Sequence, residues 1–411
     1  MSEGSARREE ILQAAARLFA DEGITASIHQ LADACGILPG SLYHHFDSKE
    51  AIVVELVARY RADLDSVADE ALAGAGAASP EERIVGLATA IAACAIRHRA
   101  AVVLTYFEPP TRSGEELSMS AGIDPGVSTR RALTKVLQGT SADGFLQPEI
   151  DSVAFASYLW QEMVQIAMRR YQTASSDQRM PELKCRILLH GLAAQRFEPA
   201  GTTKALEAAD EAMATWDTAV APDEDPKRTA IVAAARAEFA RRGYEATTVR
   251  DVASAAGVSA RSTYRMVGSK EELLVATMSG YATYVLEGWK RVIAAERPAV
   301  ETIDALSWLY LNALDRFSEE HKIQFQTLTR SPNPSTQSNW AFPTQLRMLK
   351  DCLDEGTRSG DLGDRPAGLD LWARTVFALL HTPETTLKEL GPSDAFALTR
   401  ATVLNGAARR G

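Results

Sequence analysis

The apolar residues near the start of the chain recur at the spacing of an α-helix. Ile11, Leu12, Ala15, Leu18 and Phe19 fall on one helical face, which predicts an amphipathic helix. Patterns of the same kind predict further helices over residues 51–72, 81–107, 128–137, 151–171, 182–197, 204–216, 271–296, 300–318, 344–358 and 369–381. The chain is therefore predicted to be all-α.

A short stretch after the first helix has the pattern of two short helices joined by a tight turn. Residues 27–35 form one brief amphipathic segment, and Gly36 ends it because a residue without a Cβ adopts a left-handed cap at little steric cost. Pro39 suits the first turn of a second helix, in which Leu42 and Phe46 can pack inward. Two short helices about a glycine turn predict a helix-turn-helix. Such pairs are also common in all-α proteins, so spacing alone leaves a purely structural role open.

The second half of the chain restarts the opening pattern after about residue 220. Ser27 with Gln30, and Thr248 with Asp251, form matching capping-box patterns at the start of a short helix. Three pairs of segments correspond: Arg8–Gly23 with Arg228–Gly243, Ser27–Gly36 with Thr248–Gly257, and Ile37–Glu50 with Val258–Glu271. A fainter echo relates residues 137–146 to residues 353–362. The chain is predicted to be a tandem repeat.

Residues 36–50, read as Gly-x-x-x-Gly-x-Leu-Tyr-x-His-Phe-x-Ser-Lys-Glu, resemble the signature of TetR-type bacterial repressors. Residues 8–23 resemble that family's first helix. The resemblance implies two fused TetR-type units, each with a helix-turn-helix head and a helical regulatory domain. We expect the domains at 1–52, 53–218, 219–274 and 275–411, with the acidic, proline-bearing stretch 221–226 as the junction between units.

The resemblance also implies which residues meet DNA, because helix N-termini and hydroxyl groups suit phosphate. In the first head they are Ser27, His29, Pro39, Gly40, Ser41, Tyr43, His45 and Lys49. His44 is a further candidate, although neighbours about 100° apart on a helix rarely both reach the DNA. In the second head the corresponding residues that are kept are Thr248, Arg250, Ser259, Ser262, Tyr264 and Lys270.

The second head departs from the signature at four positions. Arg261, Thr263, Met266 and Val267 stand where the first head has Gly40, Leu42, His45 and Phe46. Arg261 and Arg265 can read guanine or hold phosphate. Loss of the Leu–Phe pair predicts looser anchoring of the reading helix. This head is therefore expected either to read a different half-site or to contribute weakly.

Charge separates the two heads further. The whole chain carries a formal net charge of −10, which argues against non-specific coating of nucleic acid. From residue 7 to 49, four Lys or Arg stand against six Asp or Glu, a balance of −2. From residue 227 to 270, nine stand against three, a balance of +6. Only the second head is predicted to have a phosphate-attracting field.

Family members are homodimers, and this resemblance implies that the two units pack within one chain as a pseudo-dimer. Residues 151–171 and 369–381 look like the pairing helices, although a dimer of such chains stays open. A fused pair need not be symmetric, so its operator need not be palindromic.

The family's regulatory domain binds a small, often apolar effector that releases the repressor from DNA. The aromatic and sulfur side chains that could line such a pocket, or simply fill the core, are Tyr106, Phe107, Tyr158, Trp160, Met163, Trp308, Tyr310, Phe325, Trp340, Phe342 and Trp372. Proline-bearing loops are expected at 108–125 and 330–343.

Other chemistry is sparse. The four cysteines are scattered, which favours core thiols in a reducing cytoplasm over a disulfide framework or a metal site. His98 is expected on a solvated face and His381 near the core. No run of 18 apolar residues and no signal peptide is found, so a cytoplasmic protein without a membrane span is expected. No cofactor, metal or catalytic site is predicted. The alternative to a repressor is a ligand-binding or architectural protein whose heads no longer read DNA.

Overall fold

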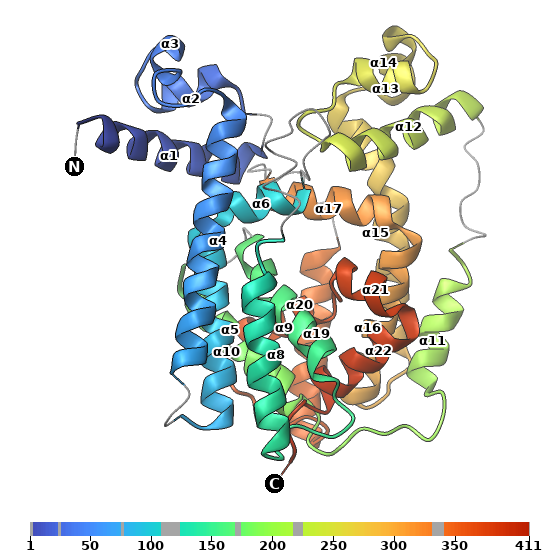
Figure 1. Cartoon of the computed structure of the whole chain (residues 1–411). Helices are drawn as coiled ribbons and strands as arrows, with labels where there is room; N and C mark the ends of the chain where they lie inside the picture. The colour runs from blue at the N-terminus through green and yellow to red at the C-terminus, as the bar shows by residue number, and fades with distance from the viewer. Residues whose placement is uncertain are drawn as a thin grey trace. The chain divides into compact units, whose positions relative to one another are not determined.

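A computed structural model describes residues 3–23, 26–74, 78–107, 124–168, 174–216, 225–330 and 341–410 (Figure 1). The chain divides into two compact units, residues 1–185 with 329–331, and residues 186–328 with 332–411. Across the described residues every named element is helical, and the sole β feature is an isolated bridge between Ala193 and Leu362. The all-α prediction is confirmed.

The first unit begins with a three-helix head followed by a long connecting helix. Its elements are α1 (Glu3–Glu22), α2 (Ile28–Ala34), α3 (Pro39–Leu42), α4 (Lys49–Ala73), α5 (Pro80–Arg97), α6 (Arg99–Phe107), α8 (Val127–Ala142), α9 (Ser152–Val164), the 3₁₀ turn Gln165–Met168 and most of α10 (Ala174–His190). The head's core is apolar and includes Phe19, Leu31, Leu42 and Phe46. Helix α4 leaves this core and packs against α5 and α8 (Figure 1).

Two helices of the first half are shorter than the sequence predicts. The helix expected over 81–107 breaks at His98, and the two parts, α5 and α6, are bent by 87°. His98 caps α5, and its ring is held by Asp63 of α4 at 2.8 Å, so a side-chain contact fixes the break. The helix expected over 182–197 ends at His190, because Gly191 takes a φ of +78° and turns the backbone away.

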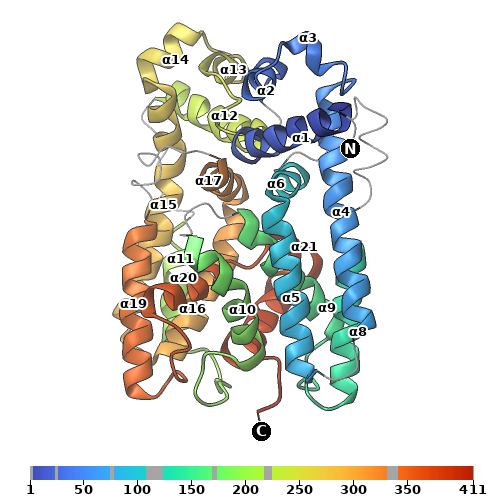
Figure 2. The same ribbon diagram turned by 90° about the vertical axis from the view of Figure 1, so that its left-hand side faces the viewer.

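The second unit repeats the plan. Its elements are α11 (Lys204–Met213), α12 (Pro226–Arg242), α13 (Val249–Ala255), α14 (Ala260–Val267), α15 (Lys270–Ala294), α16 (Ala299–Arg316), α17 (Ser318–Arg330), α19 (Phe342–Ser359), α20 (Leu369–Leu379), α21 (Glu384–Leu390), α22 (Pro392–Thr399) and the π-helical turn Arg400–Leu404. Figure 2 shows the head helices α12–α14 at the outer end of the long α15. Proline at the first position of α12, with the Asp225 side chain as its cap, starts the second head.

Helix α11 lies between the two repeats, ahead of the second head. It packs along α15 and α16. The indole N–H of Trp308 donates to Asp210 at 2.9 Å, and Trp216 meets Phe317 with ring centroids 5.1 Å apart. The segment before the second head is thus bound to that head's own regulatory helices. The loops expected at 108–125 and 330–343, and the junction at 221–226, fall mainly outside the described residues.

The carboxyl ends of the two repeats cross inside the second unit. Leu192 donates its N–H to the carbonyl of Val403 at 2.9 Å, and Ala407 donates in return to Leu188 at 2.9 Å. Ala193 donates to Leu404 at 3.0 Å, and Ala408 donates to Leu189 at 2.8 Å. In each pair of bonds the two repeats exchange the roles of donor and acceptor at corresponding positions. The crossing therefore has a local two-fold relation.

Two glycines stand at the centre of this crossing. Gly191 and Gly406 have φ of +78° and +81°. A Cβ on Gly191 would lie 2.3 Å from the carbonyl oxygen of Leu404, and one on Gly406 would lie 2.3 Å from the carbonyl carbon of His190. Both positions therefore require glycine, for conformation and for space.

No single helix in the described ranges is long and apolar enough to cross a membrane. One bent pair, Pro80–Arg97 with Arg99–Thr105, passes the same test by length and composition.

Candidate nucleic-acid interface

Both heads build the helix-turn-helix that the sequence predicts. Ser27 and Gln30 form a reciprocal capping box at the start of α2, and Thr248 and Asp251 form one at α13. Gly36 and the matching Gly257 have φ of +64° and +67°, so each turn uses the left-handed conformation expected of glycine. The first helix of each motif thus starts and ends where the sequence indicates.

The reading segment of the first head is shorter than expected. Helix α3 covers only Pro39–Leu42, and the next residues form turns in which His44 donates to Ser41 and His45 donates to Leu42. Two local features account for the short α3. Gly40 is a poor helix former, and Leu38 at the N-cap has no side-chain oxygen to accept the free N–H groups.

The second head forms a longer reading helix from a weaker signature. Ser259 caps α14 by accepting the N–H of Ser262 at 3.2 Å, and the helix runs for eight residues. Thr263 and Val267 are buried, and the Thr263 hydroxyl donates to the carbonyl of Ser259 at 3.3 Å. The smaller pair is thus still buried and its hydroxyl has an acceptor, while the looser anchoring expected from the loss of the Leu–Phe pair stays a prediction.

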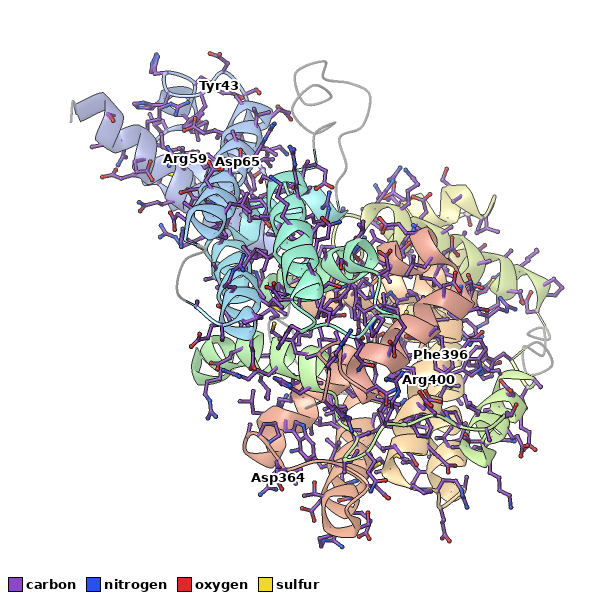
Figure 3. All side chains as sticks on the ribbon, turned by 60° about the horizontal axis from the view of Figure 1, so that its bottom comes forward. Tyr43, Arg59, Asp65, Asp364, Phe396 and Arg400 are labelled. Atoms are coloured by element: carbon purple, nitrogen blue, oxygen red, sulfur yellow. The ribbon has the colours of Figure 1, made fainter. Side chains whose placement is uncertain are left out.

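The outer face of the first head is polar and aromatic with little charge. Tyr43 is 53% exposed, and Figure 3 shows it on the outer surface of the head. His44 is exposed whereas His45 is half-buried, so His44 is the freer of the two to meet a ligand. Gly40 has no heavy atom within 4 Å of where a Cβ would lie, so internal packing does not require glycine there.

Leu38 is an exposed residue of the first head that was not among the predicted DNA contacts. It is 76% exposed beside Pro39 at the start of α3. An exposed leucine next to a reading helix can contact a thymine methyl group. The available signal was an apolar residue at an N-cap position, where Ser259 stands in the second head.

The outer face of the second head carries the positive charge. Arg250, Arg261 and Arg265 are exposed and make no ion pair within the described part of the chain, and Tyr264 is 55% exposed. The other arginines of this head are engaged: Arg236 pairs with Glu320, and Arg242 with Glu238 and Asp251. Three exposed arginines of this head, one on α13 and two on α14, are thus left for contacts outside the head.

The lysines selected as backbone contacts also have structural partners. Lys49 donates its Nζ to the carbonyl of Ala26 at 3.3 Å. Lys270 donates to the carbonyl of Glu245 at 3.0 Å and lies over the Tyr244 ring at 4.4 Å. Burial lowers the pKa of Lys270, against the opposing charges of Glu245 and Glu271. Both lysines join the start of the long helix to the segment before the motif.

The residues suggested for effector pockets lie mostly in packed core. Tyr158, Met163, Tyr310 and Trp372 are buried. Trp160 donates its indole N–H to Thr129 at 2.9 Å, and Trp308 donates to Asp210. Phe342 packs edge-on against Phe377, and Phe325 stacks on His321. Trp340 lies outside the described residues, as do the side chains of Tyr106 and Phe107.

One small cavity of about 20 Å³ lies between α15, α16, α17 and α19 in the second unit. Its walls are Met278, Tyr281, Ala282, Val285, Tyr310, Gln324, Ala341 and Gln345. Tyr310 is the one residue of the predicted set that lines it. This volume suits about one water molecule. His381 lies beside it as a satisfied near-core histidine: Nδ1 is 2.8 Å from the carbonyl of Phe377, and its ring meets Tyr310.

Comparison with known proteins places both heads in one family. The family described as bacterial regulatory proteins, tetR family, matches residues 11–56 and 231–277. The chain is 36% identical over 159 residues to the HTH-type transcriptional repressor KstR2 of Mycolicibacterium smegmatis, a match that covers 36% of this chain and 72% of that repressor. It is 54% identical over 61 residues to KstR2 of Rhodococcus jostii, covering 15% of this chain and 30% of the relative.

Among solved structures, the ketosteroid transcriptional regulator KstR2 of Mycobacterium tuberculosis is similar to part of the chain. It shares 29% sequence identity and matches with a TM-score of 0.39, covering 44% of this chain and 92% of the other.

Proposed function

This chain belongs to the tetR family of bacterial regulatory proteins and carries two of its DNA-binding units in tandem, and we propose that it is a repressor that reads an asymmetric operator. The observation that carries the proposal is the difference between the two outer faces. The first presents Leu38, Tyr43 and His44, whereas the second presents Arg261, Tyr264 and Arg265. Faces with such different donors suit different base sequences.

The carboxyl-terminal crossing supports a pseudo-dimer within one chain. Its reciprocal hydrogen bonds join the end of the first repeat to the end of the second. Two heads carried by one chain correspond to the two heads of a homodimer but need not be identical. The proposed working unit is therefore the single chain, acting in the cytoplasm on double-stranded DNA.

We further propose that a small, apolar effector releases the DNA. Support comes from the cavity between α15, α16, α17 and α19, whose walls are mostly apolar with two glutamine side chains. At about 20 Å³ it cannot hold such a molecule in this state. Effector binding would have to move these helices apart, and α15 is the helix that continues into the second head.

The test is a DNase footprint of the purified full chain on the DNA that flanks its own gene. Protection of two adjacent major-groove segments of unlike sequence is expected. Tyr43→Ala should remove protection from one segment and Tyr264→Ala from the other. Tyr43→Phe is the comparison variant. It keeps the ring and removes only the hydroxyl that can donate to phosphate, so it separates the contribution of the hydroxyl from that of the ring.

Other footprints would change the proposal in defined ways. Protection of two identical segments would contradict the asymmetric operator. Protection of one segment would mean that a single head reads. No salt-sensitive, sequence-selective binding at all would favour the alternative, a ligand-binding or architectural protein. A compound that raises the melting temperature and also releases the footprint would identify the effector.

A further inference from the structure

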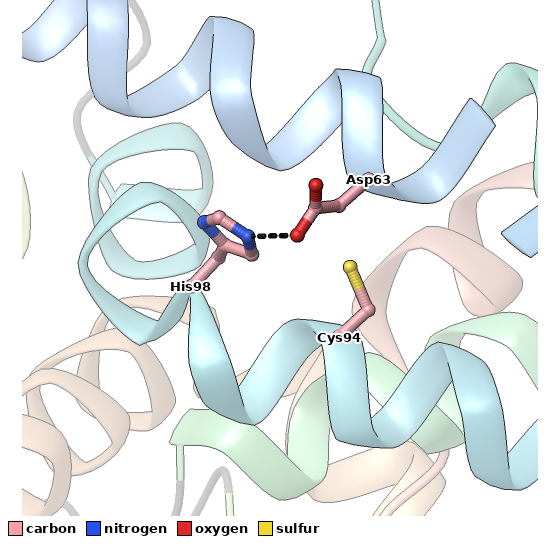
Figure 4. A group of neighbouring side chains, drawn as sticks. All are labelled: Asp63, Cys94 and His98. Carbon is pink, nitrogen blue, oxygen red and sulfur yellow. Dashed lines mark hydrogen bonds and ion pairs between the residues drawn. The ribbon is translucent and has the colours of Figure 1, made fainter. Parts of the chain in front are cut away.

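The fold brings together three metal-ligating side chains that are separated in the sequence. Asp63 of α4 lies beside Cys94 of α5 and His98, the residue that caps α5, as Figure 4 shows. One carboxylate oxygen, the Cys94 sulfur and one His98 ring nitrogen all lie within 4.8 Å of one another. Elsewhere in the described residues no other group of three such side chains meets this condition. The scattered cysteines gave no paired metal-ligand spacing, and His98 was expected on a solvated face. His98 is in fact mostly buried, with a 17% exposed side chain.

We propose that Asp63, Cys94 and His98 form a binding site for Zn²⁺ in the first unit. One thiolate, one imidazole and one carboxylate are ligands that Zn²⁺ prefers, and three protein ligands leave a fourth position open to water or another small ligand. Cys94 and His98 are four residues apart, so they lie on one face of α5 and its cap. Ligation would connect α4 to α5.

The contacts now present are compatible with ligation. His98 Nε2 is 2.8 Å from Asp63 Oδ2, and Arg97 Nη1 is 2.9 Å from the same oxygen. Arg97 has a side chain that is 64% exposed and can move away without leaving a buried charge. Asp63 has a second carboxylate oxygen, so it can bind a metal with one and still accept from Arg97 with the other. Binding would require the Cys94 thiol to lose its proton and the ligating nitrogen of His98 to carry none.

A buried hydroxyl next to this group has no partner among the described residues. It belongs to Tyr60, which is 1% exposed and makes no hydrogen bond through its hydroxyl within the described ranges. Tyr60 lies three residues before Asp63 on α4, and its ring centroid is 5.7 Å from that of His98. An unpaired buried hydroxyl is costly unless water or a ligand satisfies it. A metal-bound water in the open fourth position would be one such partner.

The second repeat shows that the fold does not need polar residues here. Helices α4 and α15 are both 25 residues long, and α5 and α16 are both 18 residues long. Counting from their first residues, Tyr284, Ala313 and the capping Phe317 take the places of Asp63, Cys94 and His98. Tyr284 stacks on Phe317 with centroids 5.9 Å apart. Aromatic packing fills this place in one repeat, so a packing role alone does not account for the polar group in the other.

The experiment uses the full chain, stripped of metal by a chelator and then titrated with Zn²⁺ or Co²⁺. One equivalent of Zn²⁺ should bind and raise the melting temperature. The Co²⁺ form should show the charge-transfer absorption that reports a cysteine ligand. Cys94→Ser should abolish this absorption, and His98→Gln or Asp63→Asn should weaken Zn²⁺ binding at least about tenfold. Cys352→Ser, which removes a thiol from the other unit, should change neither result.

Two outcomes would overturn the site. One is a wild-type protein that binds no equivalent of Zn²⁺ and shows no cysteine-to-cobalt band, a result that requires no variant to fold. The other is binding that persists unchanged in Cys94→Ser and His98→Gln. If Cys94→Ser fails to fold by circular dichroism, the triple variant Cys35→Ser, Cys185→Ser, Cys352→Ser decides. Cys94 is the only thiol in this triple variant, so the cobalt absorption band must survive there. Loss of the band would assign the metal to another cysteine.

Discussion

The two repeats agree most closely where their carboxyl ends cross and differ most in their heads. At the crossing, Gly191 and Gly406 have nearly the same φ and four backbone hydrogen bonds come in reciprocal pairs. In the heads, one reading segment is a four-residue helix followed by turns, and the other is an eight-residue helix with exposed arginines.

This difference follows from what each region must contact. At the crossing each repeat is the other's partner, so a change on one side has to fit the unchanged side. In the heads the outer residues are exposed, so a change there does not have to fit a buried neighbour. Buried anchoring is kept in both heads, as Leu42 and Thr263 are each 1% exposed or less, while the outer residues differ.

The largest effect is expected from adding a methyl group at the crossing. Gly191→Ala and Gly406→Ala should each cost more than about 4 kcal/mol of unfolding free energy, because a Cβ meets backbone atoms and the positive φ disfavours alanine. Circular dichroism with urea unfolding measures this. If the crossing is as symmetric as its hydrogen bonds, the two losses should be similar.

Gly86→Ala is the matched control, since this glycine lies within α5 and has no heavy atom within 4 Å of a new Cβ. Alanine in a helix interior should stabilise by about 0.5–1 kcal/mol. A mild effect at Gly406 with a severe one at Gly191 would break the two-fold description of the crossing.

The second-largest effect is expected from side chains that anchor the reading segments of the two heads in their cores. Phe46→Ala should destabilise the first head by about 3–5 kcal/mol, because the ring is 3% exposed and also carries the Arg8 guanidinium 4.3 Å from its centroid. Val267→Ala removes less buried surface and should cost about 1.5 kcal/mol. Hydrogen exchange followed by mass spectrometry on peptides from each head separates the two.

Val275→Ala, at an exposed position of α15, should leave exchange in both heads unchanged. Equal losses for Phe46→Ala and Val267→Ala would show that side-chain size at this position does not set the anchoring.

Much of the heads could be predicted from the sequence because their signals are local. A capping box spans four residues, and a left-handed glycine turn depends on one. Ser27 with Gln30, Thr248 with Asp251, Gly36 and Gly257 all behave as expected. The repeat itself was visible for the same reason.

Features that join distant residues could not be read in this way. The crossing needs Gly191 beside Gly406, and nothing near either glycine indicates its partner. Asp63 reaches Cys94 and His98 only because α4 packs on α5. The short α3 was missed for another reason: the signature drew attention to Pro39 and Gly40 as a helix start, while the missing cap at Leu38 limits that helix.

A third effect concerns charge on the outer faces. Replacing Arg261 and Arg265 together by alanine should weaken operator binding about 10- to 100-fold and reduce the slope of log affinity against log salt by about 2. Fluorescence anisotropy with labelled operator at several salt concentrations measures both. Arg358→Ala, an exposed arginine on α19, is the control for general charge. An unchanged slope would mean that the second head does not meet phosphate.

The smallest expected effect is a difference in pH dependence between the two capping boxes. The first head uses the amide of Gln30, which does not titrate, whereas the second uses the carboxylate of Asp251. Hydrogen bonds from the hydroxyl and N–H of Thr248, and the nearby Arg242, hold the pKa of Asp251 below its usual value of 3.8. A depressed pKa means that the ionised form stabilises the folded head. This contribution is present above pH 3.8 and is lost as the pH falls through the folded pKa.

Acid should therefore loosen the start of α13 before that of α2. Amide exchange, corrected for its intrinsic pH dependence, should rise as the pH falls below 3.8, and more in peptides containing residue 251 than in those containing residue 30. Asp251→Asn keeps an oxygen that can accept from Thr248 but cannot titrate, so it should remove the difference between the heads. Parallel loss in both heads, unchanged by Asp251→Asn, would instead assign the acid response to carboxylates elsewhere and leave the caps equivalent.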